Sequence, residues 1–86
     1  MSNTNTKYSK KELEDSIKRA FNEVTDYNLH YILVDGWTMR NSFLREGIYH
    51  GINNEFIEKR GEIKDSQYLG EKYFLTDKGI KYFFNK

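Results

Sequence analysis

The spacing of hydrophobic residues changes close to Gly61. Over most of the chain before that glycine, apolar residues recur every three or four positions, as they do on one face of an α-helix. Beyond it, Glu62–Lys64 and Lys72–Leu75 alternate with a period of two, which is typical of strands, and Gly70 allows a turn between them. A chain of 86 residues with this order of patterns is restricted to a small α+β fold.

The first helix has the clearest start. Ser9 and Glu12 form a capping box, in which each side chain accepts a hydrogen bond from the backbone N–H of the other residue. The apolar residues that follow share a stripe of about 100° on a helical wheel. They are Leu13, Ile17, Ala20, Phe21 and Val24. We therefore predict a helix over residues 10–25, preceded by a flexible N-terminus over residues 1–7.

The run Leu29–Val34 is short and apolar, and Asp35-Gly36 closes it. A strand is the preferred interpretation, but a short buried helix has nearly the same signature, so both stay open. Near the C-terminus, Thr76 is placed to cap a last short helix. Four phenylalanines on helices are expected to share one buried cluster. They are Phe21, Phe43, Phe56 and Phe83.

Helical spacing returns after Trp37, with Asp35 or Thr38 as candidate caps. Gly47 stands where a left-handed residue would end a first helix. We predict a second helix over His50–Arg60, so that the two form a helix-turn-helix.

One continuous helix from Thr38 to Arg60 is the alternative. Gly47 and Gly51 would each cost such a helix about 1 kcal/mol relative to alanine. Two helices are therefore favoured, with Ile52 and Phe56 facing inward in the second.

The expected order of elements is helix, strand, helix, helix, strand, strand, helix, as in a winged helix-turn-helix. The segment Tyr73–Gly79 resembles the Tyr-x-Leu-Thr-x-x-Gly segment that follows the wing in winged-helix regulators of the MarR and PadR kind. The chain is also similar to small winged-helix single-stranded-DNA-binding proteins of staphylococcal cassette elements, at Trp37, Gly51, Gly61–Ile63 and Tyr73. The resemblance implies a single winged-helix domain over residues 8–86, with a small antiparallel sheet.

Composition restricts function and origin. Basic and acidic residues nearly cancel, 14 against 13, which excludes a polybasic or an acidic tail. Lysine outnumbers arginine 10 to 4, and asparagine and isoleucine are common, as in AT-rich genomes. We therefore expect a low-GC bacterium, or one of its phages or mobile elements, as the source.

The resemblance implies DNA binding, and it nominates His50–Arg60 as the recognition helix. Phosphates would then be bound by basic residues around that helix and on the wing, while asparagine, glutamine and tyrosine lie near bases. These nucleic-acid-binding candidates are Arg40, Asn54, Lys59, Arg60, Lys64, Gln67, Tyr68 and Lys72. Trp37 is expected in the core beneath the helix pair, although it would stack on bases if it were exposed.

A second function class stays open. Asn54, Glu55 and Glu58 would form an acidic outer face on the predicted helix, and carboxylates facing phosphates are repelled. This face favours a winged-helix module that docks a protein partner, for example a host enzyme. We place a DNA-binding regulator or single-strand binder first, because fold-level analogy supports it.

Catalysis is not expected. The chain has no cysteine, no nucleophile motif and no glycine-rich phosphate loop, and its two histidines lie 20 residues apart, at His30 and His50. His30 is expected to be structural. We therefore expect a cytoplasmic protein without catalytic residues, metal or cofactor, which does not enter a membrane. Its oligomeric state stays open, and a homodimer is compatible with the sequence.

Overall fold

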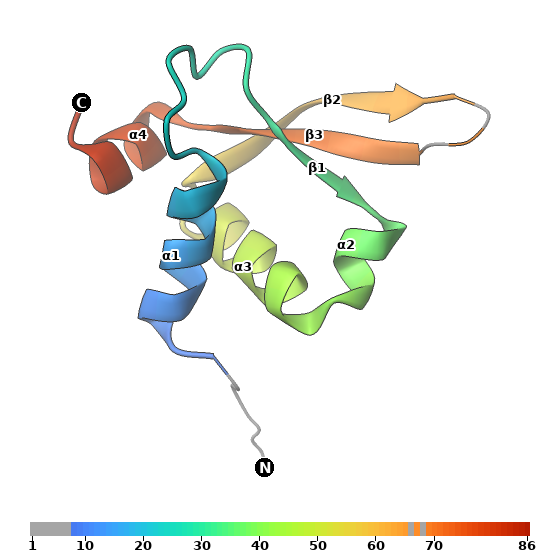
Figure 1. Cartoon of the computed structure of the whole chain (residues 1–86), viewed down its shortest axis with the longest axis horizontal. Helices are drawn as coiled ribbons and strands as arrows, with labels where there is room; N and C mark the ends of the chain where they lie inside the picture. Colours follow the sequence, from blue (N-terminus) through green and yellow to red (C-terminus); the bar gives the residue numbers. More distant parts are fainter. Residues whose placement is uncertain (1–7, 66, 68) are drawn as a thin grey trace.

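The computed structural model describes residues 8–65, 67 and 69–86, and it shows the predicted α+β architecture. These residues form four helices and three strands (Figure 1). In chain order they are α1 (Lys10–Ala20), β1 (Ile32–Asp35), α2 (Gly36–Arg40), α3 (Ser42–Asn53), β2 (Ile57–Lys64), β3 (Leu69–Leu75) and α4 (Asp77–Phe84). The predicted flexible segment 1–7 lies outside the described residues.

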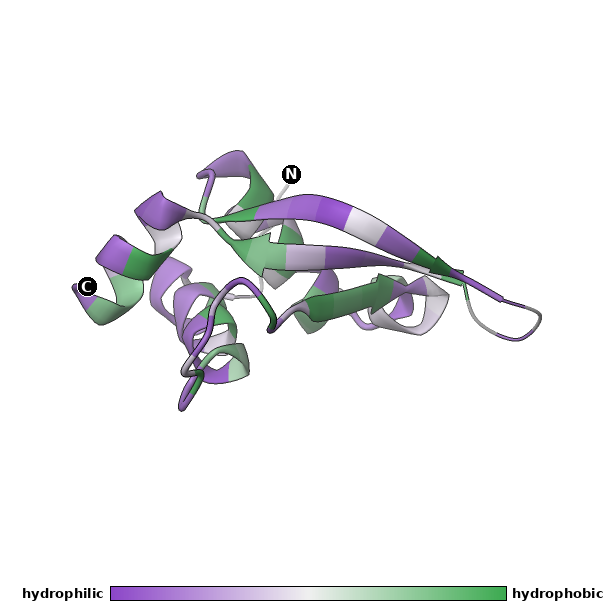
Figure 2. Cartoon of the chain, turned by 90° about the horizontal axis from the view of Figure 1, so that it is seen from above, coloured by the Kyte–Doolittle hydropathy of each residue, from purple (hydrophilic) through white to green (hydrophobic). Residues whose placement is uncertain are grey.

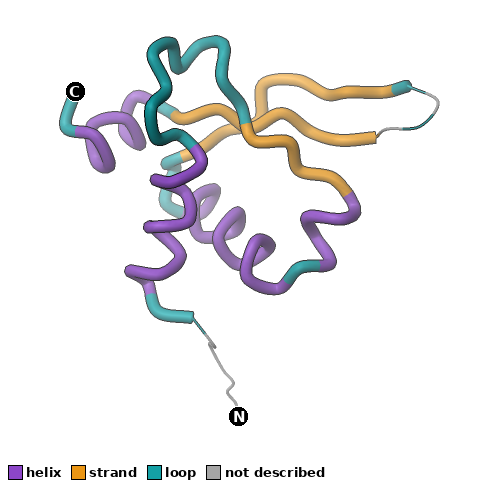
Figure 3. The backbone as a smooth tube through the Cα atoms, in the orientation of Figure 1, coloured by secondary structure: helices purple, strands orange, loops and turns teal. Residues whose placement is uncertain are grey.

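The three strands form one antiparallel sheet in the order β1-β3-β2 (Figure 3). Ile32–Asp35 is a strand, which settles the open question about this apolar run. The register between β2 and β3 shifts between Lys59 and Glu62, where Gly61 has a φ of 141°. Gly61 therefore serves a β-bulge, because a residue with a side chain rarely adopts that angle. The hairpin of β2 and β3 extends beyond the helices (Figure 1).

The capping box of α1 is confirmed. The Ser9 side chain accepts from the Glu12 backbone N–H at 3.1 Å, and the Glu12 carboxylate accepts from the Ser9 N–H at 3.0 Å. The helix ends at Ala20 rather than Thr25, because the chain turns at Glu23, which has a φ of 67°. A residue in that left-handed conformation cannot continue a helix.

The break between the two central helices lies at Asn41, not at Gly47 as predicted. Asn41 has an extended backbone, and its side chain accepts from the Leu44 N–H at 3.0 Å, so it caps α3. Gly47 and Gly51 instead lie inside α3 and are buried where α3 packs against α1. A Cβ on Gly51 would stand 3.1 Å from the Ile17 side chain of α1, so the glycine allows the two helices to approach.

The predicted recognition helix His50–Arg60 is wrong. Helix α3 ends at Asn53, and Glu55 has a φ of 61°. The Phe56 N–H then donates to the Gly51 carbonyl at 2.8 Å, and the Glu55 N–H to the Ile52 carbonyl at 3.0 Å. This pair of bonds is a Schellman ending, with glutamate at the position that glycine usually occupies.

The core lies between α1, α3 and the inner face of the sheet. Its buried residues are Ile17, Phe21, Val34, Ile48, Ile57 and Leu75. Phe21 and Phe56 are buried as predicted, at 0% and 4% exposure, and Phe83 packs against the core. Phe43 is outside this cluster and contacts the Tyr8 ring instead, with centroids 5.0 Å apart. Figure 2 shows that β1, which contributes Val34 to this core, is mainly hydrophobic, whereas β2 is mainly hydrophilic.

The close packing at Gly79 gives the first prediction. A Cβ on Gly79 would overlap the Phe56 carbonyl oxygen, which is backbone and cannot move independently. Gly79→Ala should therefore lower the free energy of unfolding by about 3 kcal/mol in a urea titration. Gly47→Ala is the control, because the close contact of its Cβ would be with the Ser16 hydroxyl, a side chain that can shift, while the Leu13 carbonyl oxygen stays at an ordinary 3.9 Å. That change should stay within about 1 kcal/mol, since the gain in helix propensity offsets a small side-chain shift. Equal losses in the two variants would contradict the packing described.

Candidate nucleic-acid interface

A groove separates α2 and α3 from the sheet. It encloses ≈ 410 Å³, and side chains from all three regions line it. The lining is mainly apolar and includes Val34, Met39, Ile48, Tyr49, Ile52 and Tyr73, with the carboxylates of Asp35 and Glu71 at its polar end. The inner side of the projecting hairpin therefore faces the same space as the outer part of α3.

Helix α3 presents a short polar face to solvent. Because Gly47, Ile48 and Gly51 are buried, helical geometry places the opposite side at Ser42, Glu46, Tyr49 and Asn53. Tyr49 is 46% exposed, and Asn53 is exposed one turn beyond it. The only charged residue on this face is Glu46, whose carboxylate lies 4.0 Å from Arg45 Nε. This face therefore carries hydrogen-bonding groups and an aromatic ring rather than positive charge.

Trp37 is exposed, and the expectation that it lies in the core is wrong. It is 74% exposed on α2, the helix whose Gly36 and Met39 line the groove. Thr38 is the residue of α2 that turns inward, and its hydroxyl donates to the Leu33 carbonyl at 3.3 Å. Leu69, at the start of β3, is 72% exposed. Exposed apolar side chains mark a binding surface only where they form a contiguous patch.

The basic residues on the groove side of the hairpin are paired with carboxylates. Lys59 Nζ lies 3.0 Å from Glu71 and 3.2 Å from Glu62, and Lys64 Nζ lies 3.5 Å from Glu62. Hydrogen bonds to Glu71 and then Glu62 hold the pKa of the Lys59 ammonium above its ordinary value. The two predicted phosphate ligands are therefore brought together, but they are neutralised by acids from the same hairpin.

Two further candidates lie on the outer face of the sheet. Arg60 stacks over the Phe74 ring at 5.3 Å and pairs with Glu58 at 3.3 Å. Lys72 Nζ lies 4.9 Å from the centroid of the Tyr31 ring. Because side chains alternate between the faces of a strand, these cations are separated from Lys59 and Lys64 by the sheet itself. The predicted wing bases thus do not form one surface.

The other predicted nucleic-acid residues are scattered. Arg40 is exposed at the end of α2. Gln67 is exposed at the hairpin tip, where its backbone N–H donates to Asp65 at 2.8 Å. Tyr68 lies outside the described residues.

The predicted acidic helix face does not exist, because Asn54, Glu55 and Glu58 lie beyond the end of α3. The Asn54 side-chain amide donates to the His50 carbonyl at 2.8 Å, so it helps to end α3. Glu55 lies in the left-handed turn, with its carboxylate 4.0 Å from Lys78, and Glu58 lies in β2 beside Arg60. A turn and a strand cannot place these side chains at helical spacing, because the helix ends before them.

Both histidines have structural partners. His50 Nε2 lies 2.9 Å from the Glu14 carboxylate, which also accepts from the Tyr82 hydroxyl at 2.8 Å, so α1, α3 and α4 are joined. The hydrogen bond to Glu14, together with burial, raises the pKa of Tyr82. His30 Nε2 lies 3.1 Å from the Ala20 carbonyl, as expected of a structural histidine. Within the described ranges, no group of three acidic or histidine side chains is arranged to hold a metal ion.

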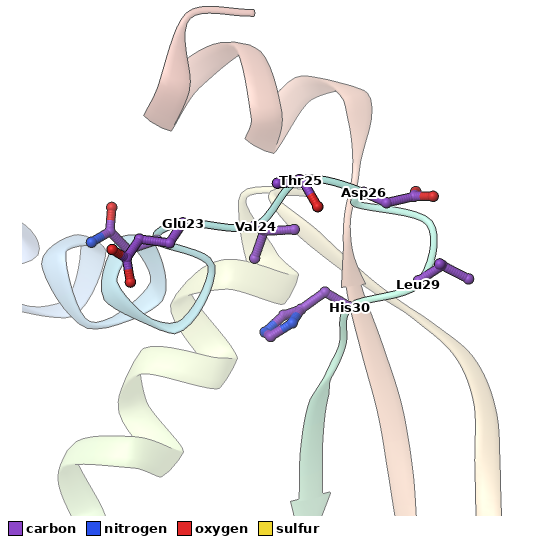
Figure 4. Close-up of a pocket in the computed structure, with 7 residues that line it drawn as sticks. Glu23, Val24, Thr25, Asp26, Leu29 and His30 are labelled. Carbon is purple, nitrogen blue, oxygen red and sulfur yellow. The ribbon is translucent and has the colours of Figure 1, made fainter.

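A shallow hollow of ≈ 310 Å³ lies under the loop between α1 and β1 (Figure 4). Leu29 and Asp26 point away from it, and the His30 ring turns under the loop. Its polar groups serve the loop itself, since the Asp26 carboxylate accepts from the Asn28 N–H at 2.9 Å. The hollow therefore offers no converging groups for a ligand.

Sequence reasoning missed Tyr49, Asn53 and Leu69 as surface residues. The helical period would have placed Tyr49 and Asn53 together on the outer face if Asn41 had been recognised as the cap of α3. Leu69 gave no such signal, because an apolar residue before Gly70 is equally typical of a buried strand end.

Comparisons with protein-family models, with curated proteins and with solved structures gave no match for this chain. Among the described residues, the longest helix, α3, has 12 residues, and no helix is long and apolar enough to cross a bilayer.

Asp35 positions α2, and this gives a pH prediction. Its carboxylate accepts from the Thr38 N–H at 2.9 Å and from the Thr38 hydroxyl at 3.0 Å, and these bonds lower the pKa of Asp35. A lowered pKa in the folded state means that this stabilisation is present above the ordinary value, about 3.9, and is lost as the pH falls through the folded value. Fluorescence of Trp37 should therefore stay constant down to about pH 4 and change below it.

Asp35→Asn is the matched variant for this measurement. An asparagine side chain still accepts from the Thr38 N–H but does not titrate, so most of the acid response should disappear while the helix remains. Glu71→Gln, which removes another carboxylate of the groove, should leave the response in place. A response that survives in Asp35→Asn would assign it to another carboxylate.

The neighbouring asparagines Asn53 and Asn54 give a stability prediction. Asn54→Ala removes the hydrogen bond to the His50 carbonyl and should cost about 1 kcal/mol in a urea titration. Asn53→Ala should change the free energy of unfolding by less than about 0.5 kcal/mol, since that side chain is exposed. A larger loss for Asn53 would show that its amide has a structural role.

Proposed function

We propose that this chain is a winged-helix protein that binds single-stranded DNA. The order of elements, the sheet order β1-β3-β2 and the hairpin that projects past the helices all support this assignment. In this interpretation α2 and α3 are the helix-turn-helix, α3 takes the place of the recognition helix, and β2 with β3 is the wing.

The exposed aromatic side chains of α2 and α3 carry the proposal. Trp37 and Tyr49 are 74% and 46% exposed, on the two helices that form one wall of the groove. Exposed rings that gain nothing from the core are available to stack on bases, which contributes roughly 1–3 kcal/mol per base. Bases in a duplex are already stacked on each other, so such rings favour an unpaired strand.

The distribution of charge also favours a single strand over a duplex. Strands β2 and β3 together carry four basic and three acidic residues, a net charge of +1. Duplex binding depends on neutralising many phosphates, and a hairpin with a net charge of only +1 supplies too little positive charge for that. Stacking on a single strand supplies part of the affinity without charge. The ion pairs of Lys59 and Lys64 are on the surface and contribute little, so phosphates can replace the carboxylates at small cost.

The basic residues nearest the aromatic pair would contact phosphates. Arg40 follows Trp37 on α2, and Arg45 lies on α3 one turn before Tyr49. Lys64 and Lys59 are available from the opposite wall. Arg60 and Lys72 would contribute only to a strand that passes around the hairpin, because they cover Phe74 and Tyr31 on the outer face.

Docking of a protein partner remains the second candidate, and one observation favours it. The groove is lined mainly by apolar side chains, and the basic residues beside it are already paired. A surface with aromatic residues and little net charge is also typical of a protein interface. The acidic helix face no longer supports this function, since no such face exists among residues 54–58.

Trp37 is the only tryptophan in the chain, so its fluorescence reports directly on the proposed site. Titration with a single-stranded oligonucleotide at low salt should quench its emission, and a duplex of the same sequence should quench it much less. A second titration at higher salt measures how many phosphates are contacted.

Trp37→Ala should weaken binding in a mobility-shift assay at least about tenfold, because one stacking contact is lost. Leu29→Ala is the matched control, since Leu29 is 75% exposed but lies on the distant loop between α1 and β1. Both variants should keep the parental urea midpoint. If the duplex quenched the Trp37 emission as much as the single strand does, the preference for single strands would be contradicted. No shift and no quenching at low salt would reject nucleic-acid binding and leave partner docking.

A further inference from the structure

The outer face of α3 places two hydrogen-bonding side chains on either side of an exposed ring. Glu46 precedes Tyr49 by three residues and Asn53 follows it by four, so all three share one side of the helix. The Glu46 side chain is 42% exposed, and Asn53, the last residue of the helix, is also exposed. A base that stacks on Tyr49 would therefore have its edge within reach of a carboxylate or an amide.

Two neighbouring polar side chains already donate to backbone carbonyls. Arg45 Nη1 donates to the Met39 carbonyl at 2.9 Å, which holds that guanidinium toward α2. The Asn54 amide donates to the His50 carbonyl at 2.8 Å. This leaves Glu46 and Asn53 as the groups beside Tyr49 on the outer face that can meet a base edge.

We propose that this face selects bases that carry an exocyclic amino group. The inference rests on the proposed binding of single strands, and it goes further by naming the bases that are preferred. A carboxylate only accepts hydrogen bonds, so Glu46 attracts an amino group and repels an exocyclic oxygen at the same position. The amide of Asn53 can accept from an amino group while it donates to the ring nitrogen beside it, but it can also turn over to pair with an oxygen and a ring N–H, so Glu46 sets the preference and Asn53 adds affinity.

Cytosine and uracil separate this preference from other effects. Both are pyrimidines. Cytosine carries an amino group beside a ring nitrogen that accepts a hydrogen bond, whereas uracil carries an oxygen beside a ring N–H that donates one. Stacking on Tyr49 and contacts to phosphate should be nearly the same for both. Any difference in affinity between deoxycytidine and deoxyuridine strands therefore reports on base edges.

The experiment measures the dissociation constants of deoxycytidine and deoxyuridine oligonucleotides of equal length, by fluorescence anisotropy of a labelled strand. It is done at mildly alkaline pH, where cytosine is unprotonated and strands stay single. The full chain should bind the deoxycytidine strand about tenfold more tightly, which is the lower part of the range for one well-formed base contact.

Three variants locate the effect. Glu46→Gln should reduce the ratio of the two dissociation constants toward one, while binding of both strands becomes tighter because a negative charge near phosphates is removed. Asn53→Ala should weaken binding of both strands alike and leave the ratio nearly unchanged. Asn22→Ala, an exposed asparagine in the turn after α1, is the control and should leave the ratio unchanged.

The outcomes separate this inference from the function on which it rests. If both strands bind equally, the preference is rejected and single-strand binding stands. If the ratio is high but insensitive to Glu46→Gln, another group reads the base and the proposal is wrong. If neither strand binds at low salt, the proposed function itself fails.

Discussion

The backbone contact between the turn after α3 and the start of α4 is the constraint on which the rest of this fold depends. The Thr76 hydroxyl donates to the Glu55 carbonyl at 2.6 Å, and the Thr76 N–H donates to the Phe56 carbonyl at 3.0 Å. Gly79 then packs so closely on Phe56 that no side chain would fit between them. These contacts fix the end of α3, the start of β2, the end of β3 and the start of α4 at one point. The hairpin therefore projects from a rigid base, and its inner side stays opposite α3.

This constraint explains which parts of the fold could be predicted. Capping signals are local, so the start of α1 at Ser9 and of α4 at Thr76 could be read directly from the sequence. The glycines of α3 could not, because their role depends on how closely α1 approaches, and that contact joins residues about 30 positions apart. The end of α3 could not be predicted either, because Glu55 takes the left-handed conformation that usually indicates glycine at a helix end.

The candidate site was predicted less well than the fold, because the availability of a basic side chain for a ligand depends on which carboxylates and rings lie beside it. The basic residues of the β2–β3 hairpin were recognised individually, but the register between these strands decides that Lys59 meets Glu71 and that Arg60 covers Phe74. A one-residue difference in register would have placed them on the opposite face. Likewise, the exposure of Trp37 follows from the short length of α2, in which the inward position is taken by Thr38. The site is thus a product of register and helix length, which single residues do not encode.

The position of β2 at the border of the sheet has a consequence for the behaviour of the chain at high concentration. A border strand offers its unpaired backbone groups to any other strand, and long flat borders lead to fibrous aggregates. Here the bulge at Gly61 interrupts the strand after four residues, and five of its eight residues are charged. A second strand could not pair along its whole length without burying these charges. The same charged residues that leave the hairpin with a net charge of only +1 therefore keep neighbouring molecules from joining edge to edge.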